Sequence, residues 1–265
     1  MTQNDGRSGF APVRRVFITG GTSGLGQAIA RHFHRLGADV GIFDLAIPDG
    51  AAEAIAAGVV SSGRILPFRG DVREEADLVR AVEGFTAACG HIDVVVCAAG
   101  IVRPGRLEEM PLGEFRAVMD TNLVGSLLTF RAALPALRRR PSGPCGAKVV
   151  FISSINATHP KQGMGAYSLS KVAINNMTRV LAREHAAEGI QINAIAPGTI
   201  DTPMVSNLMS SLAGGGEVKL YGEAPIGRVG APTDILKPLD LLCAEDETFM
   251  TGAVITLDGG RSAAD

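Results

Sequence analysis

The chain has 265 residues, of which 46% are hydrophobic and 20% are charged, and its formal net charge is −2. This length and composition suffice for a large buried core and exclude a disordered chain. The nearly balanced charge gives no electrostatic reason to expect nucleic acid or an anionic membrane surface as a partner.

The N-terminal residues 1–12 are polar and show no signal peptide, so we expect a flexible tail before one domain over residues 13–265. The longest apolar run, residues 94–102, is shorter than the about 18 residues that a transmembrane helix needs. The four cysteines form no CxxC pair and no metal-binding spacing. We therefore expect a cytoplasmic protein with free thiols and no bound metal.

Apolar runs alternate with helix-length amphipathic segments along the rest of the chain. The runs are rich in Val and Ile without strict alternation, which is typical of parallel strands covered on both faces. No linker rich in Pro, Gly or Ser divides them. The pattern predicts an α/β fold, a Rossmann-type doubly wound parallel sheet of about seven strands with helices on both faces. The predicted strands are residues 14–20, 38–44, 64–72, 92–100, 147–154, 190–198 and 253–260.

A glycine-rich loop, "TGGTSGLG", lies between the first predicted strand and the first predicted helix. Gly20, Gly24 and Gly26 allow the backbone to turn sharply and to approach phosphate groups closely. The N-terminus of the following helix offers free N–H groups, and Thr22 and Ser23 add hydroxyl groups. A plain turn is the alternative, but the strand–loop–helix context favours a nucleotide site.

The helix after this loop has an apolar face at Ile29, Phe33 and Leu36, and Gly37 suits its C-terminus. Asp44 ends the second predicted strand, 18 residues after Gly26. A carboxylate there can accept hydrogen bonds from ribose hydroxyls and repels a 2′-phosphate. An ordinary solvated Asp is the alternative. No Arg or Lys lies within the loop or directly after Asp44, so the sequence favours NAD(H) over NADP(H).

Tyr167 and Lys171, in "YSLSK", lie one helical turn apart on one face of a predicted helix. An ammonium group near the phenol favours the phenolate and lowers the pKa of Tyr167. Tyr167 could then exchange a proton with an alcohol or a carbonyl. Without the other motifs, an ordinary Tyr/Lys pair on a helix surface would be the default interpretation.

The TGxxxGxG loop, the acid at the end of the second strand and the YxxxK pattern together resemble the classical short-chain dehydrogenase/reductase family, from about Arg14 to Gly260. The resemblance implies an NAD-dependent oxidoreductase that interconverts a secondary alcohol and a ketone. It also implies that Lys171 binds the nicotinamide ribose.

Four catalytic residues follow from the resemblance: Asn122, Ser154, Tyr167 and Lys171. Ser154 ends a strand thirteen residues before Tyr167, where its hydroxyl can stabilise charge on the substrate oxygen. Ser153 is the competing serine, and we expect it to bond backbone locally. The family role of Asn122 is to hold a water in a proton relay, and a polar residue that caps or bends a helix is the alternative.

The resemblance further implies the cofactor contacts and the assembly. "GDV" and "AAG" would contact the adenosine, and the "PG" segment would contact the nicotinamide. We expect a substrate lid at residues 203–223 and a homotetramer formed through the helices of Asn122 and Tyr167 and the C-terminal strand. The implied cofactor-binding residues are Gly20, Thr22, Ser23, Gly24, Leu25, Gly26, Asp44, Asp71, Val72, Ala99, Gly100, Tyr167, Lys171, Pro197, Gly198, Ile200 and Thr202.

One departure from the family lies at Cys97 and Ala98, where the family carries asparagines that support the sheet. We expect it to affect local geometry more than chemistry. The residues expected around the substrate are apolar and favour a hydrophobic or cyclic alcohol or ketone, although Arg103 and Arg106 could receive an acidic group. The apolar residues are Val102, Ile155, Met164, Met204, Val205 and Leu208.

Two other functions remain open. An NAD-binding sensor or scaffold protein without turnover could keep the glycine loop, although such proteins often lose the tyrosine or lysine. An NAD-dependent epimerase or dehydratase needs a longer substrate domain than 265 residues leave room for.

Overall fold

The computed structural model describes residues 15–140, 146–212 and 224–263. These residues form a parallel sheet of seven strands in the order β3-β2-β1-β4-β5-β6-β7. Each strand falls inside one of the predicted apolar runs, so the predicted fold class is confirmed. The strands are β1 (Arg15–Thr19), β2 (Asp39–Asp44), β3 (Ile65–Arg69), β4 (Val94–Cys97), β5 (Lys148–Ile152), β6 (Gln191–Pro197) and β7 (Val254–Leu257).

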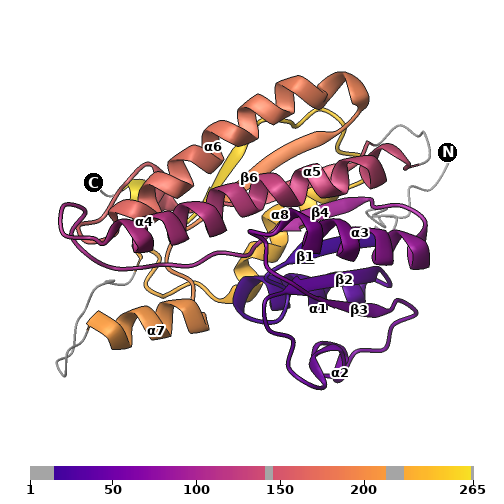
Figure 1. Ribbon diagram of the computed structural model, residues 1–265, viewed down its shortest axis with the longest axis horizontal. Coiled ribbons are helices and arrows are strands. Elements are labelled where there is room, and N and C mark those ends of the chain that lie inside the picture. The colour runs from indigo at the N-terminus through magenta and orange to yellow at the C-terminus, as the bar shows by residue number, and fades with distance from the viewer. Residues whose placement is uncertain (1–14, 141–145, 213–223, 264–265) are drawn as a thin grey trace, which may run out of the picture.

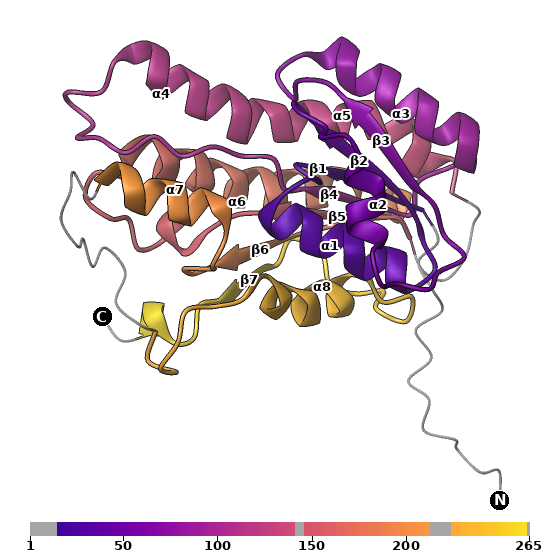
Figure 2. The same cartoon turned by 90° about the horizontal axis from the view of Figure 1, so that it is seen from below.

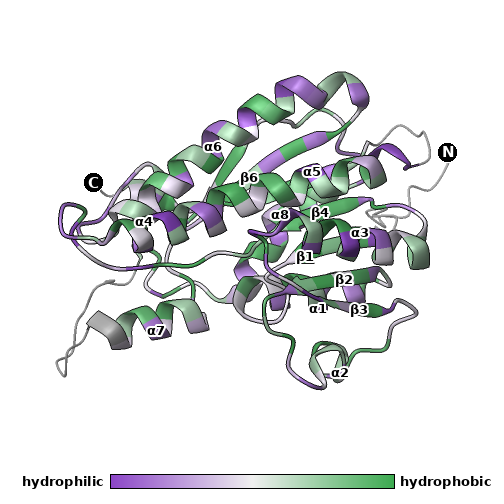
Figure 3. Ribbon diagram, viewed as in Figure 1, coloured by the Kyte–Doolittle hydropathy of each residue, from purple (hydrophilic) through white to green (hydrophobic). Residues whose placement is uncertain are grey.

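Helices cover both faces of the sheet, as Figures 1 and 2 show; in Figure 2, α3 and α5 lie above the sheet and α8 lies below it. Successive strand residues point to opposite faces, so Phe17 joins one core cluster and Ile18 the other. The green strands in Figure 3 show the apolar sequence that both clusters bury. The helices are α1 (Gly24–Arg35), α2 (Ala51–Ala56), α3 (Glu75–Cys89), α4 (Leu112–Met119), α5 (Gly125–Arg138), α6 (Gly165–His185), α7 (Pro203–Leu212) and α8 (Leu236–Cys243).

The first helix follows its predicted pattern except at its end. Ile29 and Phe33 are buried on the inner face of α1. Leu36 is 44% exposed, because α1 ends at Arg35 and Leu36 only caps it. The expectation that Leu36 continues the apolar face is therefore wrong. Gly37 follows with φ +86°, a left-handed conformation that favours glycine and ends the helix.

Helices α4 and α5 are joined by a π-helical turn, η1 (Asp120–Val124), without a break in the helix. The Gly125 N–H donates to the Asp120 carbonyl, which is five residues back rather than four. Such turns insert one extra residue into a helix and are frequent at functional sites. This turn buries Asn122 completely.

Part of the predicted lid, residues 203–212, is helix α7, which lies at the same end of the molecule as α4 (Figures 1 and 2). Residues 213–223 of that lid and the predicted tail at 1–12 lie outside the described residues. No helix in the described ranges is long and apolar enough to cross a membrane. Among the same residues, no three His, Cys, Asp or Glu side chains are grouped so as to hold a metal.

Candidate active site

A cleft with a volume of about 450 Å³ runs along the carboxyl ends of the strands. All strands of a parallel sheet end at the same edge, and ligands of open α/β sheets bind there. Every predicted cofactor contact lines this cleft except Thr22. The cleft also takes in residues from β2 at Asp44 and from the turn after β5 at Ser154.

The glycine loop is packed so tightly that side chains do not fit. A Cβ on Gly26 would lie 2.0 Å from the Gly20 carbonyl oxygen, and one on Gly20 would lie 2.7 Å from the Ala99 nitrogen. Ser23 precedes α1 and makes no side-chain capping bond to it. The first turn of α1 therefore borders the cleft without a side-chain cap, which suits an anionic group.

Asp44, at the end of β2, holds this loop by hydrogen bonds to Thr22. One carboxylate oxygen accepts the Thr22 N–H at 3.1 Å and the Thr22 hydroxyl at 2.6 Å, and the other accepts the Leu45 N–H at 2.9 Å. The Thr22 hydroxyl thus donates to Asp44, and Thr22 lines a neighbouring cavity instead of the cleft. Asp44 itself lines the cleft and is partly exposed to it.

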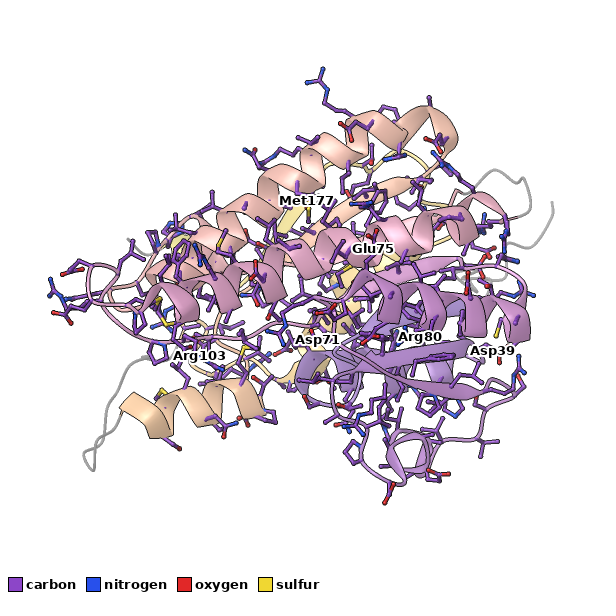
Figure 4. All side chains as sticks on the ribbon, in the orientation of Figure 1. Asp39, Asp71, Glu75, Arg80, Arg103 and Met177 are labelled. Carbon is purple, nitrogen blue, oxygen red and sulfur yellow. The ribbon has the colours of Figure 1, made fainter. Side chains whose placement is uncertain are left out.

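The Asp71 carboxylate forms an ion pair with Arg73, which was not among the predicted site residues. Arg73 donates to both carboxylate oxygens, with the shortest contact at 2.5 Å. The Arg73 hydrogen bond is the main cause that lowers the pKa of Asp71. Arg73 lines the cleft as well, so this region presents an ion pair to a ligand and not a lone carboxylate. Figure 4 labels Asp71 near the middle of the molecule.

Tyr167 and Lys171 come from the first two turns of α6. The Lys171 Nζ is buried, donates to the Ile152 carbonyl at 2.8 Å and lies 5.4 Å from the centre of the Tyr167 ring. Burial lowers the pKa of Lys171 to about 8, because water no longer stabilises the ammonium. A cation with an unusually low pKa beside a phenol in a cleft is typical of an acid–base site.

The two adjacent serines have different hydrogen-bonding partners. Ser153 donates to the Asn175 Oδ1 at 2.6 Å, which ties β5 to α6 and shows that the expected local backbone bond is wrong. The Ser154 Oγ accepts only the Asn156 N–H, at 3.2 Å, among the contacts of the described residues, and Ser154 lines the cleft beside Tyr167. Its hydroxyl proton remains available for a ligand, whereas that of Ser153 is used inside the fold.

Asn122 is buried in the π-helical turn between α4 and α5 and contacts two other segments. Its side chain accepts the Ile101 N–H at 2.8 Å and donates to the Ile101 carbonyl at 3.0 Å and to the Ser170 Oγ at 3.1 Å. It therefore links the segment after β4 to α6. A Cβ on Gly100 would lie 3.2 Å from the Asn122 Oδ1 and 3.9 Å from the Lys171 Nζ, so the side chains of Asn122 and Lys171 both pack against Gly100.

The Cys97 and Ala98 departure leaves the sheet paired. Cys97 still pairs with Thr19 of β1 and with Phe151 of β5. Its thiol is buried and lies 3.9 Å from the Ser126 carbonyl, and burial raises its pKa well above the usual range. The thiol is therefore a neutral, apolar neighbour of Lys171 rather than a second charge.

Of the two arginines considered near the substrate, only Arg103 lines the cleft; it is labelled in Figure 4. Its guanidinium donates to the Glu114 carboxylate at 2.9 Å. Arg106 pairs with Glu108 at the surface and does not line the cleft. Neither arginine is therefore positioned as a free anion receptor.

A second cavity of about 60 Å³ adjoins the cleft, and Ser154 and Tyr167 line both spaces. All six apolar residues that the sequence analysis expected around a substrate line this one cavity. Three polar residues that were not predicted from the sequence line it too: Asn156, Lys161 and Thr199. The apolar residues are Val102, Ile155, Met164, Met204, Val205 and Leu208.

Comparisons with known proteins agree with this architecture. Residues 20–262 match the family model described as enoyl-(acyl carrier protein) reductase. A cis-4-hydroxycyclohexanecarboxylate dehydrogenase of Sinomonas cyclohexanicum is 33% identical over 251 residues, which cover 94% of this chain and 97% of that protein. The chain belongs to the classical short-chain dehydrogenase/reductase family.

Other members of the short-chain dehydrogenase/reductase family are similar over nearly the whole chain. A glucose 1-dehydrogenase of Gluconobacter oxydans is 33% identical over 93% of this chain and 91% of its own. The crystal structure of levodione reductase superposes with a TM-score of 0.85 at 32% identity, covering 95% of this chain and 98% of that one. As a member of this family, the protein is an NAD(P)-dependent oxidoreductase acting on a small molecule with a CH–OH or ketone group.

Similar short-chain dehydrogenase/reductase structures hold either form of the dinucleotide. A 3-oxoacyl-[acyl-carrier protein] reductase from Brucella melitensis has NAD bound, with a TM-score of 0.78, 31% identity and coverage of 95% of this chain and 92% of that one. ElxO has NADP bound, with a TM-score of 0.82, 27% identity and coverage of 94% of this chain and 99% of that one. The choice between NAD and NADP therefore rests on the residues of this chain.

Proposed function

We propose that the protein interconverts a secondary alcohol and a ketone with NAD(H), and that Ser154, Tyr167 and Lys171 carry the chemistry. One observation supports this most strongly: Ser154 and Tyr167 line both the dinucleotide-sized cleft and the small apolar cavity beside it. A group transferred between two ligands must pass where their two spaces meet, and those two side chains lie there.

The donor set of the cleft fits a dinucleotide. The uncapped start of α1 suits the pyrophosphate, Asp44 suits the adenosine ribose, and Lys171 at the other end suits the nicotinamide ribose. When bound, NAD⁺ accepts a hydride from a carbinol carbon and NADH gives one to a carbonyl. The remaining chemistry falls to the side chains of the protein.

In the oxidation direction, Tyr167 removes the hydroxyl proton while the carbinol carbon loses its hydride, and a ketone results. Ser154 donates a hydrogen bond to the substrate oxygen and stabilises the charge that develops on it. The Lys171 ammonium favours the phenolate form of Tyr167. Asn122 fixes the segment after β4 against α6, and we assign it a supporting role in returning the proton to water through a relay.

The function is tested by following NADH oxidation over a panel of cyclic and open-chain ketones. Turnover of at least one ketone supports the proposal. Binding of NADH, seen by fluorescence, without turnover of any ketone would replace it with a nucleotide-binding sensor.

We propose NAD(H) as the preferred cofactor, because Asp44 is partly exposed at the cleft wall where a 2′-phosphate would meet its charge. The kcat/KM with NADH should exceed that with NADPH by about tenfold or more, as expected from one repulsive charge. In Asp44→Ser, this ratio should fall about tenfold. Thr22→Val keeps the carboxylate while removing one bond to it, so the ratio should persist there. A wild-type preference for NADPH contradicts the proposal.

We also propose a homotetramer. Exposed apolar side chains lie on the outer surfaces of η1 and α6, where an isolated subunit would leave them in water. Sedimentation of the wild-type chain should give a tetramer, and Leu169→Glu with Val172→Glu should give smaller species. A wild-type monomer at micromolar concentration contradicts this. The exposed side chains are Val124, Leu169, Val172 and Val180.

A further inference from the structure

Asn156 carries a buried acceptor that the fold does not use. Its side chain is 7% exposed, and within the described residues its Oδ1 has no hydrogen-bond partner. A buried oxygen without a donor destabilises a protein unless something outside the chain satisfies it. The proposed catalysis uses neither the Asn156 side chain nor this oxygen.

Asn156 follows the proposed catalytic Ser154 by two residues. Asn156 belongs to a single 3₁₀ turn (Ile155–Ala157) directly after β5. Its backbone N–H donates to the Ser154 Oγ at 3.2 Å, and this hydrogen bond links the two residues. Asn156 also lines the small cavity that Ser154 and Tyr167 share. A group that reaches the Asn156 amide therefore lies close to the substrate oxygen.

The rest of this cavity restricts what that group can be. Six of its lining side chains are apolar, and Lys161 is the one charged side chain among the described lining residues. A plain hydrocarbon substrate would leave the Asn156 oxygen unpaired. A carboxylate could accept from Lys161, but it has no proton to donate to the Asn156 Oδ1. A hydroxyl can donate to Asn156 and accept from Lys161 at the same time.

We propose that the substrate is a small diol, or the matching hydroxyketone, whose second hydroxyl is next to the reacting carbon and donates to the Asn156 Oδ1. This inference rests on the proposed function and names its substrate class. Oxidation removes a hydride and a proton from one carbinol, which becomes a ketone, and leaves the second hydroxyl unchanged. Asn156 is then the residue that selects diols over simple alcohols.

The test compares substrates that differ only at the second group: cyclohexanol, cis- and trans-cyclohexane-1,2-diol, and 2-hydroxycyclohexanecarboxylate. The kcat/KM of the wild-type enzyme for the better diol should exceed that for cyclohexanol by about 30-fold or more, since a site built for a hydroxyl discriminates against its absence. Asn156→Leu removes the acceptor at similar volume and should lower the diol-to-cyclohexanol ratio about tenfold or more. Asn156→Asp keeps the acceptor and should keep most of the preference.

Met164→Leu is the matched control, because it alters the same cavity without changing a polar group. It should change both kcat/KM values in parallel. A ratio that stays the same in Asn156→Leu, or a wild-type preference for cyclohexanol or the carboxylate, overturns the diol assignment and leaves the alcohol dehydrogenase intact. If Asn156→Leu does not fold, the substrate ranking of the wild-type enzyme and the ratio in Asn156→Asp decide the matter. Failure of the wild-type enzyme on every alcohol and ketone, with NADH bound, overturns the proposed function and the diol assignment together.

Discussion

Tyr167→Phe should lower kcat about a thousandfold while NADH binding changes little. The substitution removes the phenol oxygen that we propose exchanges the substrate proton, and general acid–base groups contribute about 10²–10⁴-fold to rates. The phenyl ring keeps its place on α6 beside the Lys171 Nζ, which lies 5.4 Å from the ring centre. Single-turnover kinetics and NADH fluorescence titration separate the chemical step from binding.

Ser168→Ala is the control for this variant. Ser168 is the next residue on α6, and its buried hydroxyl has no hydrogen-bond partner among the described residues. Its removal should leave kcat and cofactor binding as they are in the wild type. Full turnover in Tyr167→Phe would show that another group exchanges the proton.

Lys171→Met should lower kcat at least about a hundredfold and should also change how stability depends on pH. The pKa of Lys171 in the folded protein is about 8, below the ordinary lysine value of 10.5. Between these two pH values the unfolded chain holds a proton that the folded chain has lost, so wild-type stability rises with pH. The gain relative to Lys171→Met should reach up to about 3 kcal/mol by pH 10.5.

Denaturant unfolding at pH 7 and at several pH values up to 10.5 measures this difference. Lys237→Met, at an exposed lysine of α8, is the control and should follow the wild-type pH dependence. If the wild type and Lys171→Met differ by the same free energy at every pH, then the pKa of Lys171 is not lowered in the folded protein.

Much of the fold follows from local sequence alone. Continuous Val- and Ile-rich runs such as that of β4 are buried on both faces, and their length distinguishes them from helices. Leu36 is where this reasoning fails, because apolar periodicity does not indicate that α1 ends at Arg35. The π-helical turn at Asn122 likewise has no sequence signature, because it depends on which backbone carbonyl each N–H meets.

In the candidate site, too, some residues can be predicted from the sequence and others cannot. Glycines and the Tyr167–Lys171 pair are visible because their spacing within one element is fixed. The Thr22–Asp44 contact joins residues on two elements, and only the pairing of β1 with β2 brings them together. Asn156 and Lys161 lie in a polar stretch after β5 that has no motif at either position, and only the cavity that they line identifies them.

The contact between Asp44 and Thr22 constrains how the cofactor preference of such an enzyme can evolve or be redesigned. The carboxylate that we propose repels a 2′-phosphate also holds the glycine loop through two hydrogen bonds to Thr22. A substitution at Asp44 alone removes the repulsion and loosens the loop in the same step, so both dinucleotides bind less well. A switch to NADP therefore requires at least two coordinated changes: a new donor for the phosphate and a replacement anchor for Thr22.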